Sequence, residues 1–540
     1  MKSIKILTAF LGLIGYSCSD FLVEEPTTEV AEFEFFQTAE NAQLAVNAMY
    51  DPLGWGESST LGAGGHSYEF IFGDICSDDA EKGSVNGDQN GIANLKNFTA
   101  TGGTSNINIM WSKHFVAIGR ANLVLKNLEG SPIAESVKTE FEAEARFIRA
   151  YSYFLLVRIF GGVPLLRAPV TPDQITAKNF ERSSITEVYT LIDEDLNFAL
   201  SNLPQKGTRE IGRANQGAAA AFLIRSIVYQ IGTDNTQGYG WADVLTWTDR
   251  FISGEFGSYS LVPNYAAIFE TEGENGPESI FEIQAVDTGI GPFSHGPYIG
   301  SEWSVFQHPL FMGGWGFNTP NTSLVNSFEA NDPRRASTAL AVGEYAYGVE
   351  MVESTRNQTG YYTRKAIIPP AEWVTEKGTG YNIRKYRYAD ILLMNAEAAY
   401  HTGNASQAIS RLEEIRDRAS QSTYPRGFDP NDPMGFPVTG FTPLDNSVIP
   451  AGGQALLDFI YLERRREFGM EQLRFWDLVR TGRYVDHMDN LYGTGDIIME
   501  HSVTTANSQS PDQVIVNPIP LFPIPALEVA NWGISQNPGY

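Results

Sequence analysis

Residues 140–166, EFEAEARFIRAYSYFLLVRIFGGVPLL, constrain the fold of this 540-residue chain more than any other stretch. Glu142 and Arg146 are spaced as an ion pair on one side of a helix. Gly161 and Pro164 then end the helix, as a glycine and a following proline do. Apolar side chains recur on a second face of the same helix: Phe147, Ala150, Tyr151, Phe154 and Leu155. The segment predicts a long helix with a buried face.

Two further segments, 215–232 and 387–403, repeat this pattern of small residues, a tyrosine and a terminal glycine. After the second segment, Gly403 separates Ala399 from Ala408, and Ala396 lies one turn earlier. This spacing of small residues resembles a tetratricopeptide repeat, a helix pair that stacks on others. The sequence therefore predicts a mainly α fold with a scaffold of tetratricopeptide-like helix pairs. Unrelated helical hairpins are the alternative.

The character of the chain changes between the helical segments. Residues 254–320 and 421–453 are rich in glycine, proline, asparagine and aromatic residues, with short strand-like runs such as SIFEIQA at 279–285. Prolines in the last segment forbid a regular helix until about Ala526. We expect a less regular, loop-rich lobe beside the helices, and loops on a rigid scaffold commonly carry binding sites.

The N-terminus reads as a secretory signal. Lys2 and Lys5 precede a short apolar run that ends near small residues and Cys18. Residues 1–17 are thus predicted to be a signal peptide, and Cys18 to be the lipidated first residue of a lipoprotein. Ordinary cleavage nearby, leaving a free thiol, is the alternative. No later window is long and apolar enough to span a bilayer.

The formal net charge of −26 should repel nucleic acid and anionic lipid, so neither is an expected partner. With Cys18 lipidated, Cys76 has no disulfide partner, and we expect it to be a small buried hydrophobe. Asp74, Asp78 and Asp79 near Cys76 suggest either a solvated acidic turn, which is favoured, or a cation site.

Motifs of common enzymes are missing from the sequence: there is no GxSxG elbow, HExxH, Walker loop or CxxC pair. A glycosidase needs only two carboxylates at a set separation, and the 64 acidic residues leave that alternative open. The basic run ERRREFGMEQLRFWDLVRTGR at 463–483 also contains acids. We therefore expect internal ion pairing there in preference to phosphate binding.

Seven segments, in this order, resemble the RagB/SusD family of surface glycan-binding lipoproteins of Bacteroidota. They are CSDFLVEEP, GDICSDDAEKG, AEARFIRAYSYFLLVRIFGGVPLL, GWGFNTPNTSLVNSFEANDPRR, RYADILLMNAEAAY, the basic run at 463–483, and the terminal LFPIPALEVANWGISQNPGY. Because these blocks form the scaffold of the family, Trp315 in the fourth block is less expected to contact ligand.

The resemblance implies a SusD-like body with an N-terminal helical half at 18–232 and a C-terminal RagB/SusD half at 233–540. The ligand lobe is expected at about 254–380 and 421–453. The implied function is non-catalytic: the protein binds an oligosaccharide or polysaccharide, without a cofactor or metal, and delivers it to a SusC-like TonB-dependent transporter. It would be anchored to the outer membrane by lipid alone, facing the cell exterior.

Ligand contacts vary within such a family, so they have to be sought in the sequence itself. Sugar rings stack on aromatic side chains, and their hydroxyls need polar partners. Two stretches supply both: SHGPYIGSEWSVFQHPLF at 294–311 and WGESSTLGAGGHSYEF at 55–70. The candidates are Trp303 as the platform with Tyr298, His295 and Glu302, and then Trp55, His66 and Tyr68. For each aromatic residue the alternative is packing within the loop. A surface glycoside hydrolase and a structural or adhesive surface protein are the competing functions.

Overall fold

The computed structural model describes residues 35–56, 66–85, 87–171, 173–174, 180–233, 237–286, 301–354, 356–372, 379–437, 442–488 and 521–540, and the statements below concern these residues. Helices dominate them, as the periodicity of the sequence predicts.

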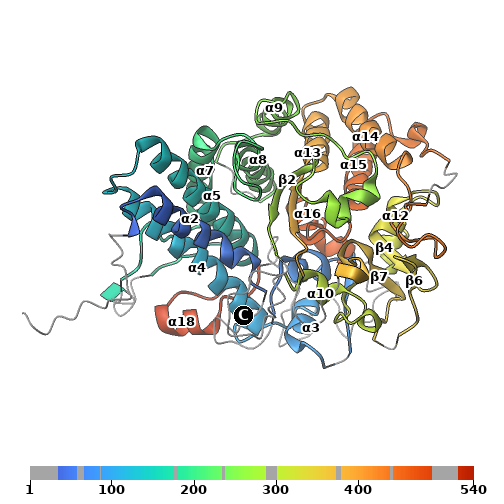
Figure 1. The fold of residues 1–540 in the computed structure, drawn as a ribbon, viewed down its shortest axis with the longest axis horizontal. Helices are drawn as coiled ribbons and strands as arrows, with labels where there is room; N and C mark the ends of the chain where they lie inside the picture. The colour runs from blue at the N-terminus through green and yellow to red at the C-terminus, as the bar shows by residue number, and fades with distance from the viewer. Residues whose placement is uncertain are drawn as a thin grey trace, which may run out of the picture.

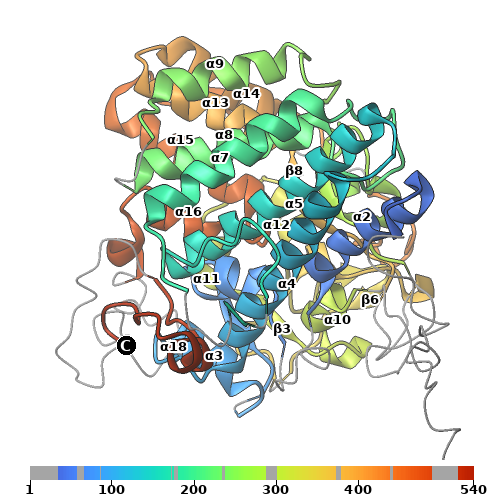
Figure 2. The same cartoon turned by 90° about the vertical axis from the view of Figure 1, so that its left-hand side faces the viewer.

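Helices that follow one another in the first half of the chain pack side by side (Figures 1 and 2). They are α2 (Ala39–Gly54), α4 (Ser105–Leu128), α5 (Glu135–Phe160), α7 (Ile185–Asn202), α8 (Gln216–Gly232) and α9 (Trp241–Ile252). Each of these helices contacts the next one, so the apolar stripe of one helix is covered by its neighbour.

The helix predicted around residues 140–160 is α5, and it is the centre of this layer. It packs against α2, α4, α7 and α8, which bury nearly all of its side chains from Phe141 onward. Arg146 Nη2 and Glu142 Oε1 form the expected ion pair at 2.6 Å. The helix ends at Phe160, where Gly161 takes a φ of +72° that favours glycine.

The predicted repeat at 387–415 is the pair α13 (Tyr388–His401) and α14 (Ala405–Ser420). Helix α13 lies between α9 and α14, and Ala396 and Ala399 are fully buried there. Gly403, at φ +82°, reverses the chain between the two helices. α15 (Gly453–Phe468) and α16 (Arg474–Arg480) follow, and α13 also contacts α15. The helical scaffold predicted from small-residue spacing is confirmed.

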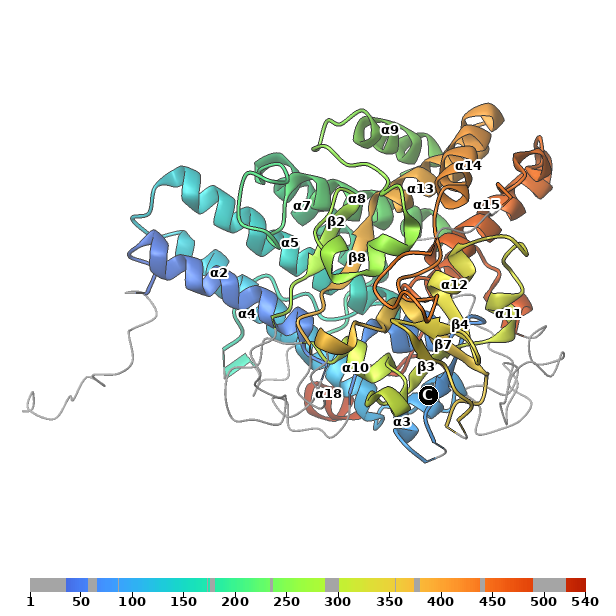
Figure 3. The ribbon, with the colours of Figure 1, turned by 45° about the vertical axis from the view of Figure 1, so that its right-hand side comes forward.

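Short strands form the loop-rich lobe, in two-stranded antiparallel sheets (Figure 3). The pairs are β1 (Ala80–Gly83) with β3 (Phe317–Pro320), β2 (Ser279–Ile283) with β8 (Ile383–Arg387), β4 (Ala339–Ala341) with β7 (Tyr361–Thr363), and β5 (Tyr345–Ala346) with β6 (Val349–Glu350). The strand-like run at 279–285 is therefore β2, and it packs on α8 and α2 at the junction of the two parts.

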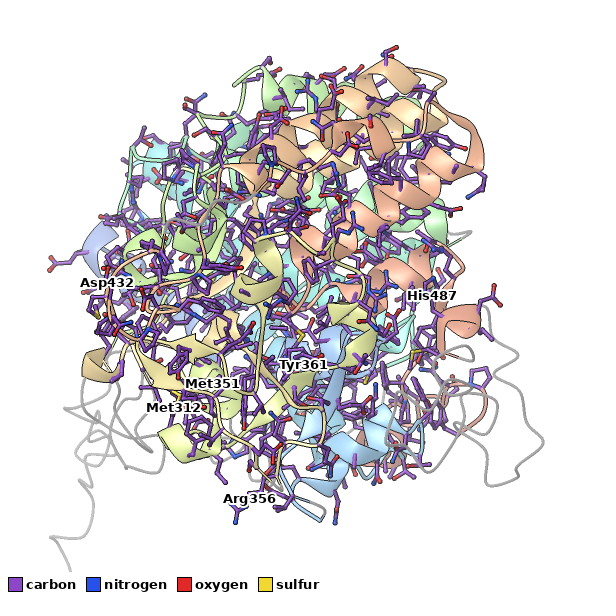
Figure 4. All side chains as sticks on the ribbon, turned by 90° about the vertical axis from the view of Figure 1, so that its right-hand side faces the viewer. Met312, Met351, Arg356, Tyr361, Asp432 and His487 are labelled. Atoms are coloured by element: carbon purple, nitrogen blue, oxygen red, sulfur yellow. The ribbon has the colours of Figure 1, made fainter. Side chains whose placement is uncertain are left out.

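Short helical segments lie before, between and after these strands. They are η1 (Ile71–Ile75), α3 (Asn90–Lys96), η2 (Tyr265–Phe269), η3 (Thr271–Gly273), α10 (Trp303–Gln307), η4 (Leu310–Met312), α11 (Thr322–Val325), α12 (Arg334–Thr338), η5 (Arg364–Ala366), η6 (Pro370–Glu372) and η7 (Asn446–Val448). The lobe has a small apolar core of its own, in which Met312 and Met351 lie near each other (Figure 4).

The C-terminal segment returns to the helical layer. In the part of this segment that the structure describes, α18 (Ala526–Trp532) begins at the predicted residue, after the last proline of the run. Trp532 packs on Phe180 with ring centroids 4.7 Å apart, and Arg182 donates to Asn537 Oδ1 at 2.7 Å. These contacts fasten the C-terminal segment to the chain just before α7.

The basic run at 463–483 turns its charges inward. Arg334 pairs with Glu463 at 2.6 Å and with Glu467 at 3.1 Å, and all three side chains are fully buried. Arg387 and Arg418 also pair with Glu467. Burial opposes ionisation of Glu467, but these guanidinium groups hold its pKa well below the usual range. The predicted internal ion pairing is confirmed.

The acidic stretch after Cys76 corrects one expectation. Cys76 is fully buried, as predicted, but Asp78 and Asp79 are buried as well and do not form a solvated turn. Arg474 Nε lies 2.6 Å from Asp78 Oδ1, and Arg465 Nε lies 2.7 Å from Asp79 Oδ1. This pairing could not be predicted from the local sequence, because both arginines lie almost 400 positions after the aspartates. Within the described ranges, no cluster of His, Cys, Asp or Glu is arranged to hold a metal ion.

In the described ranges, no helix has both the length and the apolar character needed to cross a membrane. The predicted signal peptide and Cys18 lie outside the described residues.

Candidate functional site

Trp303, the predicted stacking platform, lies in the core. Its ring stacks on Tyr381 with centroids 6.0 Å apart and is 6% exposed. A sugar needs an open ring face, and this ring offers almost none. Tyr298 and His295, its predicted partners, lie outside the described residues.

His66, Tyr68 and Glu302, predicted in two separate loops, meet in the structure. His66 Nδ1 and the Tyr68 hydroxyl each lie 3.4 Å from Glu302 Oε2. The His66 ring also packs edge-on against Trp315. All three predicted residues are buried. Glu302 Oε1 and Trp303 Nε1 have no hydrogen-bond partner among the described residues. The two loops thus form one polar cluster, but it has little accessible surface.

Trp55, by contrast, lines an accessible cavity. It follows the last residue of α2 with an extended backbone, so its half-buried ring projects beyond the helix. The Arg120 guanidinium lies over the ring, 5.2 Å from its centroid, and Arg120 Nη1 pairs with Asp51 Oδ2 at 2.8 Å. The ring is thus held in place by a cation–π contact that is itself fixed by an ion pair.

The cavity has a volume of about 470 Å³ and lies between the end of α2, the loop before α8, and β2 with the residue that follows it. This volume is within the ordinary range of small-ligand sites. Its lining mixes apolar, amide and charged side chains: Asn47, Tyr50, Asp51, Leu53, Gly54, Trp55, Glu210, Ile211, Gly212, Arg213, Phe281, Glu282, Ile283 and Gln284.

A smaller cavity of about 200 Å³ adjoins the first one. The two cavities share the wall formed by residues 210–213 with Phe281 and Glu282. The second cavity extends along the loop before α8 to Lys206, and Asn275, which precedes β2, also lines it. Gly212 has a φ of +92°, and a Cβ at this position would overlap the Gln284 side chain. Glycine is therefore strongly favoured at this position, where the shared wall lies against the residue that follows β2.

A buried network fixes this loop to the helical layer. Arg213 Nη1 pairs with Glu144 Oε2 of α5 at 2.9 Å. Tyr50 of α2 donates to the same oxygen at 2.5 Å, and its hydroxyl accepts from Ala214 N at 3.0 Å. Burial and the Glu144 carboxylate raise the pKa of Tyr50 well above its ordinary value, so the phenol stays protonated and keeps its donor role. The wall is thus held before any ligand arrives.

The chemistry of the larger cavity suits a ring that is apolar on its faces and polar at its edge. Trp55 and Ile211 supply apolar surface, and Ile211 is 76% exposed. Asn47 and Gln284 supply amide donors and acceptors, and Asp51 supplies a carboxylate.

The loop 204–215 is the part of this site that the sequence did not predict, whereas β2 lies within the predicted ligand lobe at about 254–380. The one local indication of a binding surface in this loop is Ile211 in TREIGRAN, an isolated apolar side chain among charged residues and a glycine. Nothing in the sequence pattern shows that this loop faces Trp55.

Two family models match the chain, one in each half. A model described as the SusD family matches residues 339–540, and a model described as "Starch-binding associating with outer membrane" matches residues 63–228.

Relatives of known name extend over most of the chain. SusD-like protein P38 of Formosa agariphila is 27% identical over 537 residues, which cover 91% of this chain and 94% of the relative. The starch-binding protein SusD of Bacteroides thetaiotaomicron is 26% identical over 166 residues, covering 31% of this chain and 28% of that protein.

Solved structures share the fold. A laminarin-binding SusD-like protein is 26% identical with a TM-score of 0.68, covering 93% of this chain and 99% of that one. Surface glycan-binding protein A of Bacteroides thetaiotaomicron, solved in complex with laminarihexaose, is 22% identical with a TM-score of 0.67 and the same coverage. The mainly helical architecture, the two family models and the relatives agree, and they confirm that both halves of this chain resemble the SusD family.

Proposed function

We propose that this protein binds an oligosaccharide or polysaccharide at the cell surface, with a sugar ring stacked on Trp55. The observation that carries the proposal is the accessible cavity of about 470 Å³ in which an aromatic ring, an exposed isoleucine and two amide side chains converge. The laminarihexaose complex of a protein with the same fold supports a glycan as the ligand class.

The buried cluster of His66, Tyr68, Glu302 and Trp303 remains a second candidate for ligand contact. Its support is the two polar atoms that lack a partner among the described residues, Glu302 Oε1 and Trp303 Nε1. A ligand there would first have to open the packing of Trp303 on Tyr381. The Trp55 cavity needs no such change, and it is the preferred site.

Delivery to a transporter and lipid anchoring belong to the same proposal. Multiple acyl chains on Cys18 would hold the body stably at the outer membrane, facing the exterior, because one chain alone binds only marginally. A SusC-like TonB-dependent barrel would receive the glycan. Co-purification of such a barrel with the protein from native outer membranes in mild detergent tests this part, and its absence would count against the partner.

We propose that binding occurs without catalysis or a cofactor. The direct experiment is a glycan array probed with residues 19–540, followed by calorimetry on each hit and a reducing-sugar assay on the same glycans. The proposal expects binding without release of reducing ends. Release of reducing ends would favour a surface glycoside hydrolase, with Asp51, Glu210 and Glu282 of the cavity as the first acids to test. Binding to no glycan would favour a structural or adhesive protein.

A further inference from the structure

Lys206 lines the smaller of the two adjoining cavities, and its ammonium donates to backbone carbonyls instead of a carboxylate. Its Nζ donates to the carbonyl oxygens of Gly276 at 2.7 Å and Ser279 at 2.6 Å. The same ammonium lies over the ring of Tyr259, 5.2 Å from its centroid. Among the residues that the structure describes, Lys206 has no ion-pair partner, and one of its three N–H groups is left over.

Unlike Lys206, the two arginines that line the same cavity form ion pairs with carboxylates. Arg209 Nη1 pairs with Glu140 Oε1 at 2.8 Å, and Arg213 Nη1 pairs with Glu144 Oε2 at 2.9 Å. Each guanidinium is therefore matched to a carboxylate of α5. An anion that entered the cavity would therefore form an ion pair with the Lys206 ammonium.

Glu282, the carboxylate that acts on the charge of Lys206, is engaged elsewhere. Its Oε1 accepts from Asn275 N at 3.0 Å, and its Oε2 accepts from Asn382 Nδ2 at 3.0 Å. Partial burial lowers the pKa of Lys206 from its ordinary value, and Glu282 only partly opposes this effect. The ammonium is thus incompletely compensated within the protein, and an added anion would stabilise it.

We propose that the smaller cavity binds an oxyanion substituent, a uronate carboxylate or a sulfate ester, on the glycan whose ring stacks on Trp55. This inference depends on the proposed function and narrows its ligand class to acidic glycans. A lysine ammonium serves as a point-charge partner for such groups, and the two cavities share a wall, so one chain of sugars can reach both. The net charge of −26 does not prevent this, because fields of distant surface charges are screened beyond about 8 Å at physiological salt.

The test is calorimetry with neutral, uronate-containing and sulfated oligosaccharides of equal length. Wild-type protein should bind at least one acidic series more tightly than the neutral series. Lys206→Met should weaken that binding by about tenfold to a hundredfold, the range of a hydrogen bond to a charged group, and change neutral binding less than about twofold. Lys206→Arg should keep most of the affinity. Lys126→Met, at an exposed position of α4, is the control for an equal change of net charge.

The outcomes separate the inference from the function on which it depends. Equal affinity of wild-type protein for neutral and acidic chains would overturn the inference and leave glycan binding standing. An equal loss of affinity for neutral and acidic chains in folded Lys206→Met would also overturn the inference. If the protein bound none of the three oligosaccharide series and no other glycan on the array, both the inference and the proposed glycan-binding function would be overturned. The uronate and sulfate arms identify which oxyanion the cavity takes.

Discussion

Trp55 is the residue on which the proposed binding mode depends most. Its ring is half-buried and held by Arg120, and the surrounding wall is fixed by Arg213, Glu144 and Tyr50. A platform fixed in this way loses little conformational entropy when a ligand stacks on it. Aromatic stacking is therefore expected to supply a large share of the affinity.

Trp55→Ala should weaken binding of the glycan found on the array by about 1–3 kcal/mol, by analogy with base stacking on aromatic side chains. This corresponds to about ten- to hundredfold in Kd by calorimetry. Trp247→Ala is the matched control, because Trp247 is also half-buried beneath an arginine, Arg250, but lies on α9 outside the cavity. Unchanged affinity in folded Trp55→Ala would direct attention to Trp303→Ala and the buried cluster.

Asp390 is a second residue with a testable charge. It accepts ion pairs from Arg225 and Arg464, and all three side chains are buried. Removing one partner of a buried pair leaves an uncompensated charge in the core. Asp390→Asn should therefore reduce the free energy of unfolding by about 3–5 kcal/mol, measured by urea unfolding at pH 7. Asp458→Asn, at an exposed position of α15, should change it by less than about 0.5 kcal/mol.

The same aspartate predicts a pH dependence. Burial opposes its ionisation, but Arg464 and Arg225 lower the pKa of Asp390 to about 2, below its value in the unfolded chain. A lowered folded-state pKa gives stability that is present above about pH 4 and is lost as the pH falls toward 2. The difference in unfolding free energy between wild type and Asp390→Asn should narrow by about 2–3 kcal/mol over that interval. A constant difference from pH 5 to pH 2 would contradict this assignment.

At the scale of the elements, the close crossing of α13 with α9 and α14 should tolerate no added volume. Ala399 is fully buried there, and a tryptophan would force the helices apart. Ala399→Trp should cost about 1–3 kcal/mol or more, read as a lower urea midpoint. Ser410→Trp, on the exposed face of α14, should leave the midpoint near that of the wild type. Equal midpoints for Ala399→Trp and wild type would contradict the tight crossing.

Elements whose cause is local could be predicted from the sequence. The apolar stripe of α5, the glycine after it, and the small residues of α13 each act within a few turns of one helix. The strand β2 and the start of α18 after Pro525 were predictable for the same reason.

Features that depend on distant segments could not be predicted. The burial of Trp303 requires Tyr381, and the pairing of Asp78 requires Arg474. The candidate cavity joins α2, the loop 204–215 and β2, which are separated by more than 50 residues of chain at each step. Local patterns report which face of an element is buried, but they do not report which loop will cover it.

At the scale of the whole molecule, we propose that the helical layer is a rigid support and that its junction with the loop-rich lobe is the site of recognition. The larger cavity lies at that junction, since β2 contacts both α8 and α2 and pairs with β8 (Figures 1 and 3). The lipid at Cys18 is proposed to be the only attachment of this body to the membrane.

Cys18→Ala should therefore yield a protein that no longer partitions with membranes, while its fold and glycan affinity remain those of the wild type. Fractionation of cells and detection of the protein in soluble and membrane fractions measure this. Cys76→Ala is the control, because Cys76 is buried in the core and should not affect partitioning. Retention of Cys18→Ala in the membrane fraction would contradict the lipid anchor.

A crystal structure of the protein with an oligosaccharide identified on the array would show whether a glycan binds beside Trp55. We expect density for sugar in the cavity between α2, the loop 204–215 and β2, with one ring stacked on Trp55. Sugar density over another surface, with this cavity filled only by water, would contradict this expectation.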